Sequence, residues 1–108
     1  MPQLIVVYWR DIPAQVIGKM GRKTVKRILS HRFQEAVDRA AMRAGKGSSD
    51  AYLSEWRRIR KECSGDLEQE VAIAADRFEQ TFSDDDLSRL IRAKGVDQAH
   101  IPDSSEDV

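Results

Sequence analysis

Six consecutive apolar residues, Leu4 to Trp9, lie near the start of this chain, and five of them are β-branched or aromatic. Such a run is typical of a β-strand, and its lack of polar alternation predicts a strand at the centre of its sheet. Pro13 then fixes its own φ and biases Ile12 toward an extended conformation, which predicts a turn. We expect Ala14 to Lys19 to return as a second strand, and because an isolated hairpin is marginally stable, other elements must cover or extend it.

Later segments repeat apolar residues at intervals of three and four, the period of an amphipathic helix. This period predicts a long helix over Arg22 to Ala44 and a second helix over Asp66 to Phe82. The acidic first turn of the second helix suits the positive end of its dipole. Ser83 and Asp86 match a capping box, which predicts a short third helix that stops at Gly95.

The segment from Ala51 to Lys61 fits two interpretations. Its apolar residues have helical spacing, yet Tyr52, Trp56 and Ile59 are residue types that favour strands. We expect a strand from about Ala51 to Arg58, which gives an α+β fold of order β-β-α-β-α-α, a small antiparallel sheet with helices packed on one face. With 41% hydrophobic and 33% charged residues, the composition is that of a globular protein, and we expect one domain over residues 1–95 and a flexible acidic tail over residues 96–108.

Charge divides the chain into two halves. Met1 to Glu62 carries 14 Lys and Arg against 6 Asp and Glu, a net of +8, whereas Cys63 to Val108 carries 4 against 12, a net of −8. Such a split indicates either that the halves dock on each other or that a basic face is offered to an anionic partner. The sequence leaves both interpretations open.

The basic residues concentrate at the expected start of the long helix. Exposed cations there oppose the helix dipole at a cost of roughly 0.3–1 kcal/mol each, and a bound anion would reverse this cost. The plainer alternative is that they solvate an outer face or pair with the acidic half. Together with three later arginines they form the predicted partner-binding surface, which consists of Lys19, Arg22, Lys23, Lys26, Arg27, Arg57, Arg58 and Arg60.

Gly18 to Gly21 resembles the GxxG loop of a KH domain. In that family the loop grips a nucleic-acid backbone between two helices. Pro13 lies too close to Gly18 for the helix that should precede the loop, and the helix expected after it is too long. Nucleic-acid binding through this loop and the basic residues is therefore the alternative to protein binding.

Candidate catalytic and metal-ligating residues are few and scattered. His31, His100 and Cys63 have no companions at ligand spacing, and nothing local activates Cys63 as a nucleophile. The consecutive carboxylates Asp84 to Asp86 point in different directions and suit helix capping better than a metal. We expect no catalytic residues, no metal and no cofactor, and hence a protein that is not an enzyme.

The same features predict a cytoplasmic protein without a membrane partner. The single cysteine excludes an intramolecular disulfide and fits a reducing compartment. The longest uncharged apolar run is far too short to cross a bilayer. The start Met-Pro-Gln lacks the charged region of a signal peptide. An unpaired edge strand would also make a homodimer plausible.

Three segments carry a resemblance to a known family. They are Leu4 to Val16, Arg32 to Met42, and Asp50 to Leu53 together with Glu55 to Arg58. They resemble the conserved virulence factor domain family of bacteria, over a span from Gln3 to about Gly95. The resemblance implies a small stand-alone protein or a module of scaffold-like proteins, with relatives in gene clusters for folate-linked one-carbon metabolism. We therefore expect a non-catalytic interaction or accessory protein whose partner is an enzyme of that metabolism.

Overall fold

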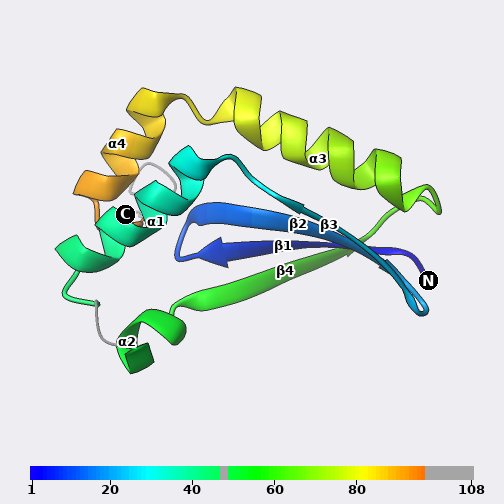
Figure 1. Cartoon of the computed structure of the whole chain (residues 1–108), viewed down its shortest axis with the longest axis horizontal. Coiled ribbons are helices and arrows are strands. Elements are labelled where there is room, and N and C mark those ends of the chain that lie inside the picture. Colours follow the sequence, from blue (N-terminus) through cyan, green and yellow to red (C-terminus); the bar gives the residue numbers. More distant parts are fainter. Residues whose placement is uncertain (47–48, 97–108) are drawn as a thin grey trace, which may run out of the picture.

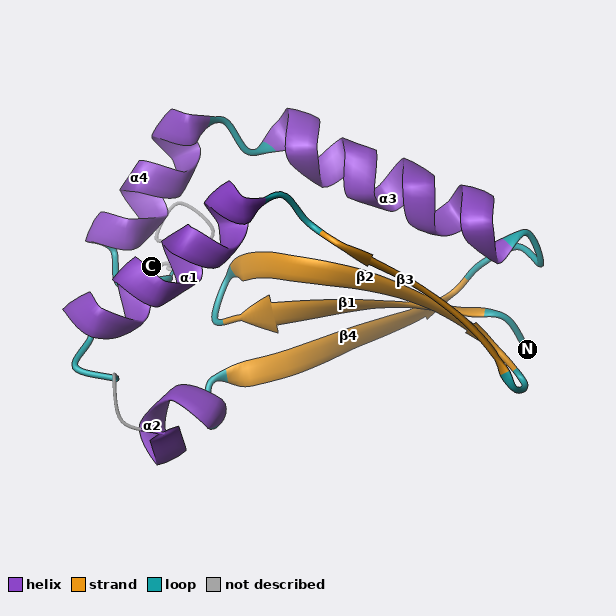
Figure 2. Cartoon of the chain, in the orientation of Figure 1, coloured by secondary structure: helices purple, strands orange, loops and turns teal. Residues whose placement is uncertain are grey.

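The computed structural model describes residues 1–46 and 49–96 of the chain. Four strands and four helices make up this part (Figures 1 and 2). In chain order they are β1 (Gln3–Trp9), β2 (Ile12–Met20), β3 (Lys23–Ile28), α1 (His31–Arg43), α2 (Ser49–Leu53), β4 (Trp56–Glu62), α3 (Leu67–Thr81) and α4 (Asp84–Arg92).

The strands form one antiparallel sheet of order β3-β2-β1-β4. The apolar run predicted to be central is β1, and its residues Leu4, Ile5 and Val7 are each less than a tenth exposed. The β1–β2 register shifts by one residue between Val7 and Tyr8, close to the turn. β3 and β4 are the two edges of the sheet.

Helix α3 runs alongside the sheet and packs against β2, β3 and, less extensively, β1 (Figure 1). Its buried stripe of Leu67, Val71 and Ala75 faces the strands. The helix comes so close that a Cβ added to Gly18 of β2 would lie 2.8 Å from Val71 Cγ2. A glycine in β2 therefore sets the distance between sheet and helix.

A second part of the core lies at the end of the sheet where β1 turns into β2, and α1 and α4 gather there (Figure 1). Trp9 is fully buried, stacks on Tyr52 with 6.0 Å between ring centroids, and donates its indole N–H to the Tyr52 carbonyl. Gly95, at φ +87°, lies so close that an added Cβ would meet the Trp9 ring at 2.9 Å. The Asp11 N–H donates to the Gly95 carbonyl at 2.8 Å, which ties the end of the described chain to this turn.

The predicted fold class is confirmed, with two elements added to the predicted order. The helix expected from Arg22 begins only at His31, because residues 23–28 form β3 instead. Gly21, at φ +59°, makes the turn that returns β3 along β2. The ambiguous segment after Asp50 contains both predicted structures, since α2 ends at Leu53 and β4 begins at Trp56.

The two later helices were predicted correctly. Asp66 caps α3 by accepting a hydrogen bond from the Gln69 N–H, and Ser83 and Asp86 form both bonds of the capping box. The acidic tail predicted after residue 95 lies almost wholly outside the described residues. None of the described helices is long and apolar enough to span a membrane.

Candidate interaction surface

The two faces of the sheet differ in what covers them. Leu4 and Val6 line a hollow together with residues of α3, so they face that helix. Ile5 and Val7 alternate with them along β1 and therefore point to the opposite side, which we call the open face. Two shallow hollows on the open face are lined by strand residues alone. No described helix covers the middle of this face.

The strand register assembles four basic side chains on the open face. Lys26 pairs with Ile17, and Ile17 pairs with Ile5. Ile5 pairs in turn with Arg60, and because directly opposed residues share a face, this row crosses all four strands. The neighbouring rows place Arg58 opposite Val7 and Lys19 opposite Gln3. We call Lys19, Lys26, Arg58 and Arg60 the cationic face.

These cations surround an apolar centre. Lys26 and Arg60 stand at opposite ends of one row, three strand spacings or about 14 Å apart. Ile17 and Ile5 lie between them. Ile5 is only 4% exposed although no described helix covers it. The aliphatic stems of lysine and arginine shield such residues while their charged ends stay in water.

The four residues of the cationic face form no ion pair among the described residues. All four of its members are exposed, and none takes part in an ion pair or a side-chain hydrogen bond within residues 1–46 and 49–96. Gln15 lies on the same face, and its buried Oε1 accepts no hydrogen bond from that part of the chain. Glu62 lies on the same face opposite Gln3, but it forms no ion pair with these cations in residues 1–46 and 49–96. The open face therefore presents a net positive charge and an unpaired acceptor.

The eight predicted binding residues do not form one surface. The prediction placed five of them at the start of the long helix, which is wrong because that helix begins at His31. The register instead divides them between the two faces of the sheet and a turn. Lys19, Lys26, Arg58 and Arg60 lie on the open face; Lys23, Arg27 and Arg57 lie on the α3 side; Arg22 lies in the β2–β3 turn.

Arg57 has a structural task. Its Nη2 lies 2.8 Å from Asp11 Oδ1, and its Nε donates to the Arg10 carbonyl. The guanidinium also stands 5.2 Å from the centroid of the Tyr8 ring. Burial raises the pKa of Tyr8, and the positive charge of Arg57 opposes that rise. Arg57 therefore fastens β4 to the β1–β2 turn.

Ion pairs join the basic and acidic halves at one place in the described structure. Arg32 pairs with Glu79 at 3.3 Å and with Asp84 at 3.2 Å. Glu79 also accepts hydrogen bonds from the Ser30 N–H and hydroxyl. Burial works to raise the pKa of Glu79, but the bonds from Ser30 and Arg32 outweigh it and hold that pKa below its ordinary value. Every other described ion pair lies within one half.

The GxxG pattern does not form a loop between helices. Gly18 lies inside β2, paired with Leu4 and Val25, and faces α3. Gly21 makes the hairpin turn. The local resemblance to a KH loop is therefore wrong, because the packing of α3 and the turn already explain both glycines.

Among the described residues no hydrogen bond joins the Cys63 thiol to His31, and His100 lies outside these residues. Burial raises the pKa of the Cys63 thiol, and nearby Glu70 raises it further. A raised pKa lowers the fraction of the nucleophilic thiolate. Within the described residues, no group of three His, Cys, Asp or Glu side chains is placed to hold a metal ion.

Sequence reasoning missed the apolar and polar members of the open face. Gln15, Ile17 and Lys19 lie two residues apart along β2, which is the period that places side chains on one face of a strand. That alternation was the available signal. The alternation does not extend to Lys26 in the prediction, because the sequence places Lys26 in a helix and so gives it no strand partner.

The comparison with protein families decides the classification. The family model described as Virulence factor matches residues 7–91. The chain belongs to the Virulence factor family. The match runs from the end of β1 into α4, so the segment of the Virulence factor family includes all four residues of the cationic face. No curated protein and no solved structure matches the chain significantly.

Proposed function

We propose that this member of the Virulence factor family is a non-catalytic interaction protein whose cationic face binds an acidic partner protein. The observation that carries the proposal is the set of four exposed cations that form no ion pair among the described residues, on a face that no described helix covers. Complementary charge steers such partners together and fixes their orientation.

The mixed chemistry of the open face favours a protein over a nucleic acid. Protein interfaces combine an apolar centre with a polar rim, which matches the partly exposed Ile17 between the cations. Sequence-tolerant binding of single strands relies on exposed aromatic rings for stacking. Of the aromatic residues on this side, Trp9 is fully buried, and Trp56, which lines one hollow, packs its ring against Tyr52. Nucleic-acid binding is therefore an outcome of the test below and not our proposal.

The proposal includes the identity and place of the partner. An enzyme of folate-linked one-carbon metabolism, encountered in the cytoplasm, is the partner class that the family resemblance suggests. Acidic groups on that enzyme would face Arg58 and Arg60, and an apolar residue would meet Ile17.

Site-specific photo-crosslinking in the bacterial cytoplasm tests this proposal. A crosslinking amino acid at Thr24, on the open face of β3, should capture one acidic protein, and nuclease treatment should not reduce this capture. The same group at Asp76, exposed on α3, is the matched control and should not capture it. Equal capture from both positions would contradict the proposed surface, and nuclease-sensitive capture at Thr24 would replace the protein partner with a nucleic acid.

A further inference from the structure

Strand β4 has one free edge. Among the described residues it pairs only with β1, and Figure 2 shows no strand on its other side. The Arg10 N–H donates to the Glu55 carbonyl at one end of this ladder, and antiparallel hydrogen bonds recur at every second residue. Odd-numbered residues of β4 therefore bond to β1. Arg58 and Arg60 direct their backbone N–H and C=O groups outward to the free edge.

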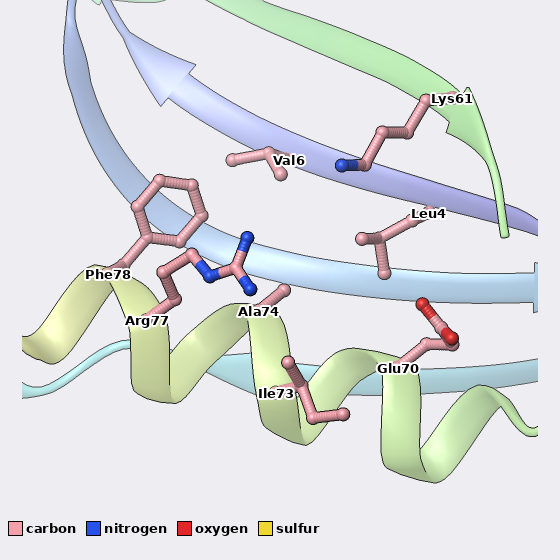
Figure 3. A pocket seen from close by; sticks show the side chains of 8 residues that line it. All are labelled: Leu4, Val6, Lys61, Glu70, Ile73, Ala74, Arg77 and Phe78. Carbon is pink, nitrogen blue, oxygen red and sulfur yellow. The ribbon is translucent and has the colours of Figure 1, made fainter.

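A hollow of about 200 Å³, lined by apolar side chains and by Lys61, Glu70 and Arg77, lies between α3 and the β4 side of the sheet. Leu4 and Val6 of β1 line it together with Phe78 of α3. Figure 3 shows Lys61 of β4 and Arg77 of α3 projecting into the hollow from opposite sides. This region can receive apolar side chains that approach along β4.

The charge of β4 excludes a second copy of the same strand as the occupant. The sequence Trp56–Glu62 reads WRRIRKE. Every antiparallel register that pairs four or more of these residues with themselves sets at least one cation opposite another. In the register centred on Ile59, for example, Arg58 faces Arg60 and Arg57 faces Lys61. Directly opposed like charges destabilise a strand pair, so the edge favours a strand of the opposite charge.

We propose that the free edge of β4 binds an extended acidic segment of a partner protein by antiparallel strand addition. Acidic residues of the segment lie opposite Arg58 and Arg60, with their side chains on the open face. The residues between them are apolar and point to the α3 side, beside Ile59, which is 47% exposed, and the hollow. This inference deepens the proposed function and rests on it for the sign of the partner's charge.

A synthetic seven-residue peptide of alternating glutamate and valine tests the inference by backbone methylation. In strand addition the glutamate N–H groups point toward β4 and the valine N–H groups point away. N-methylation of the glutamates should therefore weaken binding at least about tenfold, since the bonds to Arg58 and Arg60 are lost. N-methylation of the valines is the matched control and should leave the affinity unchanged. The unmodified peptide should also slow amide hydrogen exchange at Arg58 and Arg60.

Equal affinity of the two methylated peptides would overturn strand addition but leave the proposed function standing, because an acidic peptide would still bind the cationic side chains. Failure of the unmodified peptide to bind at millimolar concentration would also overturn the inference. The proposed function is judged separately, by crosslinking of a partner protein from Thr24.

Discussion

Gly18 occupies a point of β2 where a side chain would collide with α3. A Cβ there would lie 2.8 Å from Val71 Cγ2 and 3.3 Å from Leu67 Cβ, and both belong to a buried helix face. We expect Gly18→Ala to lower the free energy of unfolding by about 1–3 kcal/mol, measured by denaturant titration. Val71→Ala should cost less in the Gly18→Ala background than alone, because it removes the clashing methyl. Strictly additive losses would show that overpacking is not the cause.

Single residues differ in how much of their role the sequence reveals. The Ser83–Asp86 capping box was predictable because its two bonds join residues three apart. The difference between Arg57 and Arg58 was not, because it depends on register: one faces Tyr8 and pairs with Asp11, and the other faces the open side. Of these two adjacent arginines, Arg57 therefore stabilises the fold, whereas Arg58 lies on the proposed binding surface.

At the scale of elements, α3 supplies the N-terminal cap of α1. Ser30 makes no capping bond with its own side chain, and Glu79 accepts from its N–H at 2.7 Å and its hydroxyl at 2.8 Å. A carboxylate at this position also suits the positive end of the α1 dipole. The contact therefore joins two helices that the sequence separates by the whole of α2 and β4.

The lowered pKa of Glu79 gives this contact a pH dependence. A depressed carboxyl pKa contributes stability above its ordinary value of 4.5, and that contribution is lost as the pH falls through the lower, folded value. We expect Glu79→Gln to lower the free energy of unfolding by about 1 kcal/mol at pH 7, a modest value because the side chain is partly exposed. The variant and the wild type should converge as the pH falls through the lowered pKa of the folded state.

Asp76→Asn is the matched control for Glu79→Gln. Asp76 is exposed on the same helix, so this change should leave the stability nearly unaltered across the same pH range. A constant difference between Glu79→Gln and the wild type from pH 7 to pH 3 would contradict the role assigned to the carboxylate.

Elements with local signals were predictable, and the one that depends on a distant partner was not. The apolar stripes of α3 and the run of β1 carry their own periods. Val25, Ile28 and Leu29 fit the apolar spacing of the helix that follows, so the predicted helix includes the residues that form β3. Only the pairing of Lys23–Ile28 with β2 makes this segment a strand. The basic residues predicted at the start of a helix therefore lie in the sheet and its β2–β3 turn.

For the whole molecule, the opposite charges of the two halves are mostly not neutralised by ion pairs between the halves in the described residues. Only Arg32 links the halves by ion pairs in residues 1–46 and 49–96. The cations of the open face remain available, and both edges of the sheet, β3 and β4, also carry several basic residues. This distribution favours association with an acidic partner over association of the sheet with itself.

The most direct test measures the affinity of the purified partner, identified by crosslinking, for two double charge reversals of equal size. Arg58→Glu with Arg60→Glu alters the cationic face, whereas Arg43→Glu with Arg92→Glu alters exposed cations at the ends of α1 and α4. We predict that the first pair weakens binding about tenfold or more at physiological salt and that the second changes it less than about twofold. Equal dissociation constants for both variants would contradict the assignment of the open face as the binding surface.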